Sequence, residues 1–326
     1  MSTPLVCICV PCYNAEKTIA ETLESILNQT YSNIEIHIFD NASTDNTVEV
    51  VKAIADDRIY FHLAESTGTA ESNFTRCLNL ARGSYTAIFH SDDIYASDMV
   101  EKEVRFLESH PSANGVLTFA HIINDASQKV QTSYAPSCLK LGVGKSRAFE
   151  LVDLFKAVLR ENNFFFCPSA MIRTGTCTEV LKTWRGNMFG PGADLDTWFR
   201  IAESGQLGLI NLPLLQYRVS TSHFSHDYNR LKTGRADLFA ILDYWMEKPG
   251  LSESLGASDL RWYCRWSMRD HIVRANNAFR LGELKLAKSL LNDVPLMPLL
   301  IDAVSSLRGL KYCALFLLTV IKCRIL

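Results

Sequence analysis

Alternation between short apolar strands and amphipathic helices constrains this chain more than any other feature of its sequence. Four apolar segments lie in its N-terminal third, and each is followed by polar residues or by a segment with helical spacing of apolar residues. Short runs rich in β-branched and aromatic residues predict strands. Strands that alternate with helices favour a mostly parallel sheet with helices on both faces. The predicted strands are residues 5–10, 34–39, 59–62 and 85–89.

Polar residues follow three of these strands at the point where each apolar run stops. Residues 13–14 follow the first strand, residues 40–41 the second, and the pair Asp92 and Asp93 the fourth. In open α/β sheets ligands bind beyond the carboxyl ends of the strands. Two adjacent carboxylates need solvent, a cation or hydroxyl donors. An aromatic ring, an isolated acid and an acid pair together suit a nucleotide with its metal ion.

Each of these acids also has a simpler interpretation, which the sequence leaves open. Asp92 or Asp93 is equally placed to cap a helix through Met99 and Val104. Asp40 equally suits a turn that begins a helix. Three such strand ends in register favour the nucleotide interpretation.

Net charge and cysteine content limit the classes of function. The chain has 33 basic and 35 acidic side chains among 326 residues, so no basic surface for nucleic acid is predicted. No basic and apolar export segment follows Met1, and the ten cysteines therefore predict buried, reduced thiols. Cys9 and Cys12 have no second pair with which to bind zinc. These features favour a cytoplasmic protein.

Five segments, taken in order, resemble the successive motifs of glycosyltransferase family 2. The resemblance covers residues 5–110 and 164–220 and is absent beyond about residue 235. It implies inverting enzymes with the GT-A fold, a Rossmann-like, mostly parallel sheet flanked by helices, which use nucleotide-diphosphate sugars. The matching segments are Val10 to Glu16, Asp40 to Asp45, Gly68 with Asn73 to Arg76, Ala81 to Tyr85, and His90 to Asp93.

The resemblance also implies roles for the matching residues. Asp93 would bind Mn²⁺ or Mg²⁺. Arg76 would lie near the diphosphate, and the alternative of a solvated helix residue stays open. His90 stands where family members often have Asp, so the site carries less negative charge. The implied nucleotide-sugar site comprises Pro11, Tyr13, Asn14, Asp40, Asn41, Gly68, Arg76, Ser91 and Asp92.

A second segment, residues 190–200, contains the predicted catalytic base. A Gly-Pro loop opens a helix with Asp194 in its first turn, a place where the helix dipole also favours an acid. Family members have a Glu-Asp pair here, with the aspartate as general base, and this chain has Ala193 before Asp194. The resemblance therefore implies that Asp194 takes the proton of the acceptor hydroxyl. Asp196 is interpreted as a supporting residue.

Two further segments carry weaker predictions. Family members often have a histidine where this chain has Ser220, so His223 or His226 would contact the metal or a phosphate, with His223 as the predicted metal ligand. Both histidines equally suit an ordinary surface. Residues 163–169 are predicted to form a core strand, with the wall of a sugar pocket as the alternative.

The C-terminal part of the chain is predicted to be helical. We expect a glycosyltransferase domain at 1–230 and a helical region at 231–326. The basic, apolar segment 307–326 is too short to span a bilayer, which takes about 20 apolar residues. It could lie on an anionic membrane, pack on the helical region or join two copies of the chain.

The sequence therefore predicts an inverting glycosyltransferase, cytoplasmic or peripheral at the inner face of the membrane. It would transfer a sugar from a nucleotide-diphosphate donor, with UDP expected, to a hydroxyl of a glycan or lipid-linked acceptor in cell-surface polysaccharide synthesis. The alternative is a non-catalytic nucleotide-sugar-binding protein with an interaction role for the helical region.

Overall fold

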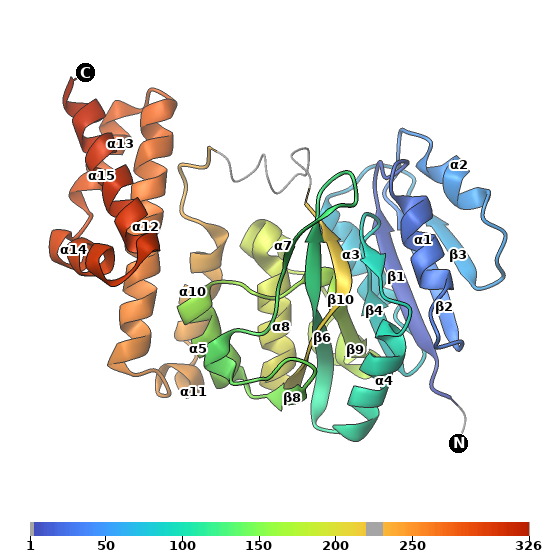
Figure 1. Cartoon of the computed structure of the whole chain (residues 1–326). Coiled ribbons are helices and arrows are strands. Elements are labelled where there is room, and N and C mark those ends of the chain that lie inside the picture. The colour runs from blue at the N-terminus through green and yellow to red at the C-terminus, as the bar shows by residue number, and fades with distance from the viewer. Residues whose placement is uncertain (1–2, 220–230, 326) are drawn as a thin grey trace. The chain divides into compact units, whose positions relative to one another are not determined.

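A computed structural model describes residues 3–219 and 231–325 of the chain (Figure 1). The chain forms two compact units, Met1–Val219 and Ser220–Leu326. The first unit contains a ten-stranded sheet with the order β3-β2-β1-β4-β9-β6-β10-β5, to which β7 adds at β6 and β8 at β10. The strands are β1 (Val6–Cys12), β2 (Ile34–Asp40), β3 (Ile59–Leu63), β4 (Tyr85–Ile88), β5 (Ile94–Tyr95), β6 (Ala113–Ile123), β7 (Lys129–Thr132), β8 (Ser146–Phe149), β9 (Ala170–Arg173) and β10 (Gln206–Arg218).

The sheet is mixed and mostly parallel in its N-terminal half. Strands β3, β2, β1 and β4 pair in parallel, as do β6 and β10. Strand β9 joins the two parallel groups because it pairs antiparallel with both β4 and β6. The predicted α/β class is confirmed, and the carboxyl ends of β1, β2, β4 and β10 all border the candidate site.

Helices cover both faces of the sheet. They are α1 (Ile19–Leu27), α2 (Thr47–Lys52), α3 (Ala70–Asn79), α4 (Met99–Ser109), α5 (Leu151–Glu161), α6 (Thr174–Thr176), α7 (Gly186–Phe189) and α8 (Ala193–Ser204). Short 3-10 or π turns lie at Ser137–Leu139, Cys167–Ser169, Cys177–Leu181 and Gly190–Gly192.

Strand β1 shows why its sequence is apolar at successive positions. Alternate residues Val6, Ile8 and Val10 belong to a core with α1 and α4, while Cys7 and Cys9 pack with Phe39 and Cys77 on the opposite face. Successive side chains of a strand point to opposite faces, so both sets are buried only when both faces are covered.

The predicted strand at residues 163–169 is wrong. Residues 167–169 form a 3-10 turn containing Pro168, and the strand begins only at Ala170. The missing N–H of proline interrupts strand pairing, so the bulky segment ahead of it is a loop.

The second unit is helical, as predicted. Its core is lined by Met268, Ile272, Ala287 and Phe316, all buried. Within residues 3–219 and 231–325, no helix has both the length and the apolar character needed to cross a bilayer. The helices are α10 (Asp237–Met246), α11 (Pro249–Ser252), α12 (Ala257–Arg280), α13 (Leu284–Asn292), α14 (Leu296–Ser305) and α15 (Leu307–Ile325).

Candidate active site

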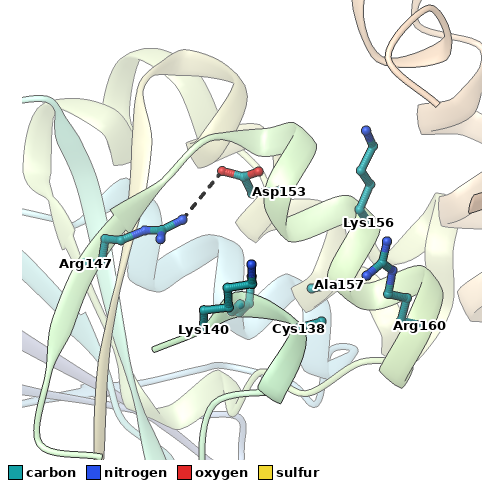
Figure 2. A pocket seen from close by; sticks show the side chains of 8 residues that line it. Cys138, Lys140, Arg147, Asp153, Lys156, Ala157 and Arg160 are labelled. Carbon is teal, nitrogen blue, oxygen red and sulfur yellow. Dashed lines mark ion pairs between the residues drawn. The ribbon is translucent and has the colours of Figure 1, made fainter. Parts of the chain in front are cut away.

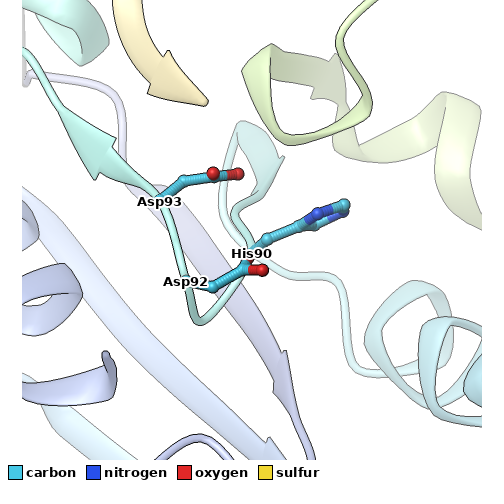
Figure 3. Close-up of side chains that lie close together, drawn as sticks. All are labelled: His90, Asp92 and Asp93. Carbon is cyan, nitrogen blue, oxygen red and sulfur yellow. The ribbon is translucent and has the colours of Figure 1, made fainter. Parts of the chain in front are cut away.

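An acidic turn after β4 brings together three groups that can bind a cation. His90, Asp92 and Asp93 each offer one ligand atom, and these atoms lie within 4.8 Å of one another (Figure 3). The alternative in which the acids cap the next helix is wrong. Strand β5 lies between the acids and α4, and Asp98 precedes that helix.

Asp93 is the buried member of this group. Its Oδ1 accepts a hydrogen bond from the backbone N–H of Arg218 at 2.8 Å, whereas Oδ2 has no hydrogen-bond partner among the described residues. Burial, together with the neighbouring Asp92 carboxylate, raises the pKa of Asp93 well above its usual range. A buried carboxylate oxygen without a donor fits a hard divalent cation, because the cation supplies the missing positive charge.

The backbone of the acidic turn is held from three sides. The buried Tyr95 hydroxyl accepts from the backbone N–H of His90 at 2.7 Å and lies 3.2 Å from its carbonyl. Thr18 donates to the carbonyl of Ser91, and Thr22 to that of Asp93. The predicted site residue Ser91 is therefore fixed through its backbone.

Arg218, at the end of β10, ties this turn to the rest of the site, and the list of predicted residues omitted it. Its side chain is buried and donates to the carbonyl of Asp92 at 2.9 Å, to Glu21 at 2.7 Å and to Ser127 at 3.0 Å. The sequence feature that could have identified Arg218 is an arginine at the last position of an apolar strand. A guanidinium that is buried there needs several hydrogen-bond acceptors from other segments.

The end of β1 forms an exposed rim beside the β2 turn. The Tyr13 ring is 47% exposed, as expected of a ring free to contact a base. Asn14 has a left-handed backbone, with φ of 49°, and its Oδ1 accepts from the backbone N–H of Thr44 at 2.8 Å. Its own N–H donates to Ser43, so the two strand ends form one surface with the partly buried Pro11 beside them.

Asp40 forms a turn with Ser43, as the simpler interpretation of this acid predicts. It is fully buried, and its two oxygens accept from the backbone N–H and the hydroxyl of Ser43 at 2.9 and 2.5 Å. Contact with a nucleotide base stays a prediction for this residue. Its neighbour Asn41 exchanges two hydrogen bonds with Gly68, at 2.8 and 3.0 Å, and so holds the loop before α3 against the end of β2.

Arg76 is not a solvated helix residue, so that alternative is wrong. Its guanidinium donates to the carbonyls of Asp40 and His62 and to the side chain of Asn73, at 3.1, 3.2 and 2.9 Å. The side chain therefore braces the ends of β2 and β3 from α3. A contact with the donor diphosphate stays a prediction.

Asp194 lies in the first turn of α8 and is partly buried. Burial raises its pKa to about 7, although hydrogen bonds from the backbone of Leu195 and the side chain of Asn163 favour the ionised form. A carboxylate with a pKa near neutrality can accept a proton at physiological pH and hold it. Ala193, at the position where the resemblance implies a glutamate, is buried.

The charges of Asp194 and of the acidic turn both act on the Tyr217 side chain. The pKa of its phenol is raised by burial and then by the charges of Asp93, Asp92 and Asp194. All three carboxylates are therefore close enough to act on one partly buried ring, which makes an edge contact with Phe166 at 5.4 Å between centroids. The sheet thus gathers residues that are far apart in the sequence into one acidic site.

Other predicted residues lie outside this group. Asp196 is fully buried, 3.6 Å from Arg185 and 3.9 Å from Arg200, which suits its predicted supporting role. His223 and His226, like Ser220, fall outside the described residues.

A separate hollow of about 200 Å³ lies between β8, α5 and residues 138–140 (Figure 2). It shares no residue with the acidic turn, and β8, which borders it, pairs with Leu207 to Ile210 of β10. Its lining is mainly cationic, with one ion pair of 3.9 Å between Arg147 and Asp153. Its one carboxylate, Asp153, thus lies beside a cation, and among the described residues no pair of carboxylates like that of the acidic turn lines this hollow.

Comparison with known proteins identifies related sequences. The model of "Glycosyl transferase family 2" matches residues 7–176. EpsE of Bacillus subtilis (strain 168) is 29% identical over 222 residues, 67% of this chain and 73% of that protein. TuaG of the same organism, named for teichuronic acid biosynthesis, is 31% identical over 241 residues, 72% of this chain and 86% of that protein.

A third relative is named for a complete reaction. The UDP-Glc:alpha-D-GlcNAc-diphosphoundecaprenol beta-1,3-glucosyltransferase WfaP of Escherichia coli is 37% identical over 105 residues, 32% of this chain and 42% of that protein. The alignment thus spans less than half of that relative.

Solved structures share the fold. The structure of S. aureus TarS 1-349 with UDP-GlcNAc has a TM-score of 0.59 at 16% identity and covers 97% of this chain and 89% of that one. The mannosyltransferase PcManGT from Pyrobaculum calidifontis, with GDP-Man and Mn²⁺, has a TM-score of 0.55 at 16% identity and covers 99% and 87%.

Proposed function

Because this chain belongs to glycosyl transferase family 2 and is a nucleotide-sugar glycosyltransferase, we propose that it is an inverting, metal-dependent enzyme that uses a UDP-sugar. The observation that carries this proposal is the pairing of two kinds of carboxylate in one site. Asp93 is buried, its Oδ2 has no hydrogen-bond partner within residues 3–219 and 231–325, and Asp194 has a pKa of about 7. The first suits a cation and the second suits proton transfer.

Asp93 would hold Mn²⁺ or Mg²⁺, together with Asp92 and His90. The bound ion would neutralise the diphosphate as it leaves the sugar. Arg218 keeps both acids in place, because it contacts the Asp93 carboxylate through its N–H and the Asp92 carbonyl through its guanidinium. The crystallised mannosyltransferase with Mn²⁺ supports this choice of cation.

The remaining predicted residues would bind the donor at the rim formed by β1 and β2. Tyr13 would stack on the base, Asp40 would accept from a base N–H, and Arg76 would lie on the diphosphate side. A base that bonded Asp40 would share an oxygen already used by Ser43. The complexes of TarS with UDP and UDP-GlcNAc support UDP as the nucleotide.

Asp194 would act as the general base of a single displacement. Its carboxylate takes the proton of the acceptor hydroxyl while the hydroxyl oxygen attacks the anomeric carbon. The bond from that carbon to the diphosphate oxygen breaks with its electron pair, so the configuration inverts and a nucleoside diphosphate leaves. Asn163, which donates to Asp194, would orient the carboxylate.

The acceptor would be a hydroxyl of a glycan or lipid-linked saccharide, in cell-surface polysaccharide synthesis. The named reaction of the E. coli relative and the name of TuaG support this class. A cytoplasmic location is supported by the free thiol state of all ten cysteines.

A donor screen tests the proposal. The full chain is incubated with UDP-, GDP- and dTDP-sugars, glycan or lipid-linked acceptors, and Mn²⁺ or Mg²⁺, and the product linkage is read by NMR. A β-linked product from an α-linked UDP-sugar is expected, and Asp194→Asn should slow its formation about 10²–10⁴-fold. Asp153→Asn, at a half-exposed carboxylate outside the site, is the control. Retention of configuration would refute the mechanism, and UDP binding without transfer would favour the non-catalytic alternative.

A further inference from the structure

Helix α14 exposes most of its large apolar side chains and buries its acidic residue. Five of its large apolar side chains are between 54 and 88% exposed, whereas its acidic residue Asp302 is 1% exposed. Surface helices normally bury the apolar stripe and expose the charges. The exposed residues are Leu296, Met297, Leu300, Ile301 and Val304.

The orientation of α14 is set by an ion pair inside the helical unit. The Asp302 carboxylate accepts from Arg269 at 2.8 and 2.9 Å and lies 3.2 Å from Arg265, both on α12. Leu299 packs into the core beside it. Because this polar side faces inward, the apolar residues on the other side of the helix face solvent.

Helix α15 continues the exposed apolar surface. Its start packs closely on α14, since a side chain at Gly309 would come within 2.0 Å of the carbonyl oxygen of Asp302. Phe316, Thr319 and Cys323 are buried, so one side of α15 faces the core. The opposite side exposes more than half of each of Leu307, Leu310, Leu317, Leu318 and Ile321. We call the exposed apolar residues of α14 and α15 the C-terminal apolar face.

The exposed charges that α14 and α15 themselves carry have one sign, and the exposed Asp293 lies just before α14. Arg308, Lys311, Lys322 and Arg324 are exposed, and in residues 294–324 the one acid is the buried Asp302. Apolar residues flanked by cations match a lipid surface with anionic headgroups. Two copies of the chain that met through this face would instead bring like charges together.

We propose that the C-terminal apolar face docks on an anionic lipid bilayer, with α14 and α15 lying in the headgroup region. A docked helix needs no 20-residue span, which accords with the absence of a spanning helix among the described residues. The assignment extends the segment predicted from sequence, 307–326, to include α14. It stands independently of the sugar-transfer reaction.

Vesicle co-sedimentation of the full chain tests the proposal. Binding is expected to vesicles of phosphatidylglycerol mixed equally with phosphatidylcholine, and much less to phosphatidylcholine alone. Leu300→Gln/Val304→Gln should lower the partition coefficient about tenfold or more. Lys311→Gln/Lys322→Gln should lower it about 25-fold at low salt, since each cation contributes about fivefold.

Matched control variants distinguish binding through this surface from non-specific binding of the protein to vesicles. Val130 and Val143 are 68 and 63% exposed in the first unit, and Val130→Gln/Val143→Gln should leave binding unchanged. Lys129→Gln/Lys145→Gln, at exposed lysines, is the charge control. Circular dichroism confirms that each variant is folded.

Three outcomes would overturn the proposal. The wild-type chain fails to bind anionic vesicles, or it binds both vesicle types equally, or the face variants bind as tightly as their controls. A dimer that Leu300→Gln/Val304→Gln converts to a monomer, without vesicle binding by the wild type, would assign the face to self-association instead.

Discussion

Replacing Asp194 with asparagine tests the proposed chemical step directly. The amide keeps the size of the side chain and an oxygen that can accept from the Leu195 N–H, but it cannot take a proton. Loss of a general base costs about 10²–10⁴-fold in rate. We therefore expect kcat to fall by that factor while UDP-sugar affinity, measured by calorimetry, stays near the wild-type value.

The pH dependence of the wild-type enzyme follows from the same carboxyl group. With the pKa of Asp194 at about 7, about one tenth of the sites carry the ionised base at pH 6 and about nine tenths at pH 8. The rate should therefore rise with pH across this interval. Asn163→Ala removes a hydrogen bond that favours the ionised form, so the pKa should increase and the rise should move to higher pH. Asn79→Ala, at an exposed position of α3, is the control.

Stability should respond in the opposite direction from activity. Folding raises the pKa of the Asp194 carboxyl group from 3.8 to about 7. Its contribution to the free energy of unfolding is therefore fully present below pH 3.8 and is lost as the pH rises through about 7. At pH 8 the loss corresponds to at most about 4 kcal/mol. Asp194→Asn should therefore be more stable than the wild type at pH 8, by urea unfolding, with a difference that shrinks toward pH 4.

Three results would refute this reasoning about Asp194. If the asparagine variant loses donor binding together with kcat, or is less stable at every pH, the residue is structural. If kcat is unchanged, the base lies elsewhere, and Asp196 is the next carboxylate of the helix to replace.

Substitutions at four other positions, with one control, test the remaining features. Asp93→Asn should abolish Mn²⁺-dependent UDP binding in calorimetry, and full wild-type activity in EDTA would contradict the metal site. Arg218→Gln should lower the free energy of unfolding by about 1–3 kcal/mol, since the Asp92 carbonyl, Glu21 and Ser127 lose a shared donor. Arg218→Lys should not restore it, because one ammonium cannot reach them all. Tyr95→Phe should cost about 1–3 kcal/mol in urea unfolding, because a backbone N–H of the acidic turn loses its acceptor, and an unchanged midpoint would count against that bracing. Asp302→Asn should cost about 3–5 kcal/mol by leaving a buried guanidinium without its carboxylate, whereas Asp293→Asn at an exposed site should be neutral in thermal unfolding.

Much of the candidate site could be predicted from the sequence, because its residues follow strands in recognisable segments. The acid pair after β4 and the aspartate at the start of α8 were located in this way. The sequence left two alternatives open that the structure decides against, a helix cap at Asp92 or Asp93 and a solvated Arg76. Both alternatives are decided by contacts with other segments. The two-residue strand β5 separates the acid pair from the next helix. The carbonyls at the ends of β2 and β3 accept hydrogen bonds from Arg76.

Local periodicity determined the α/β class and the helical C-terminal region, because spacing of apolar residues reports which side of each element is buried. It could not determine that Arg218 reaches Asp93 across 125 positions, or that α14 turns Asp302 inward and Leu296 and Leu300 outward. Those features depend on strand order and on ion pairs between helices. Contacts between distant residues are set by the packing of whole elements, and a window of sequence does not contain that information.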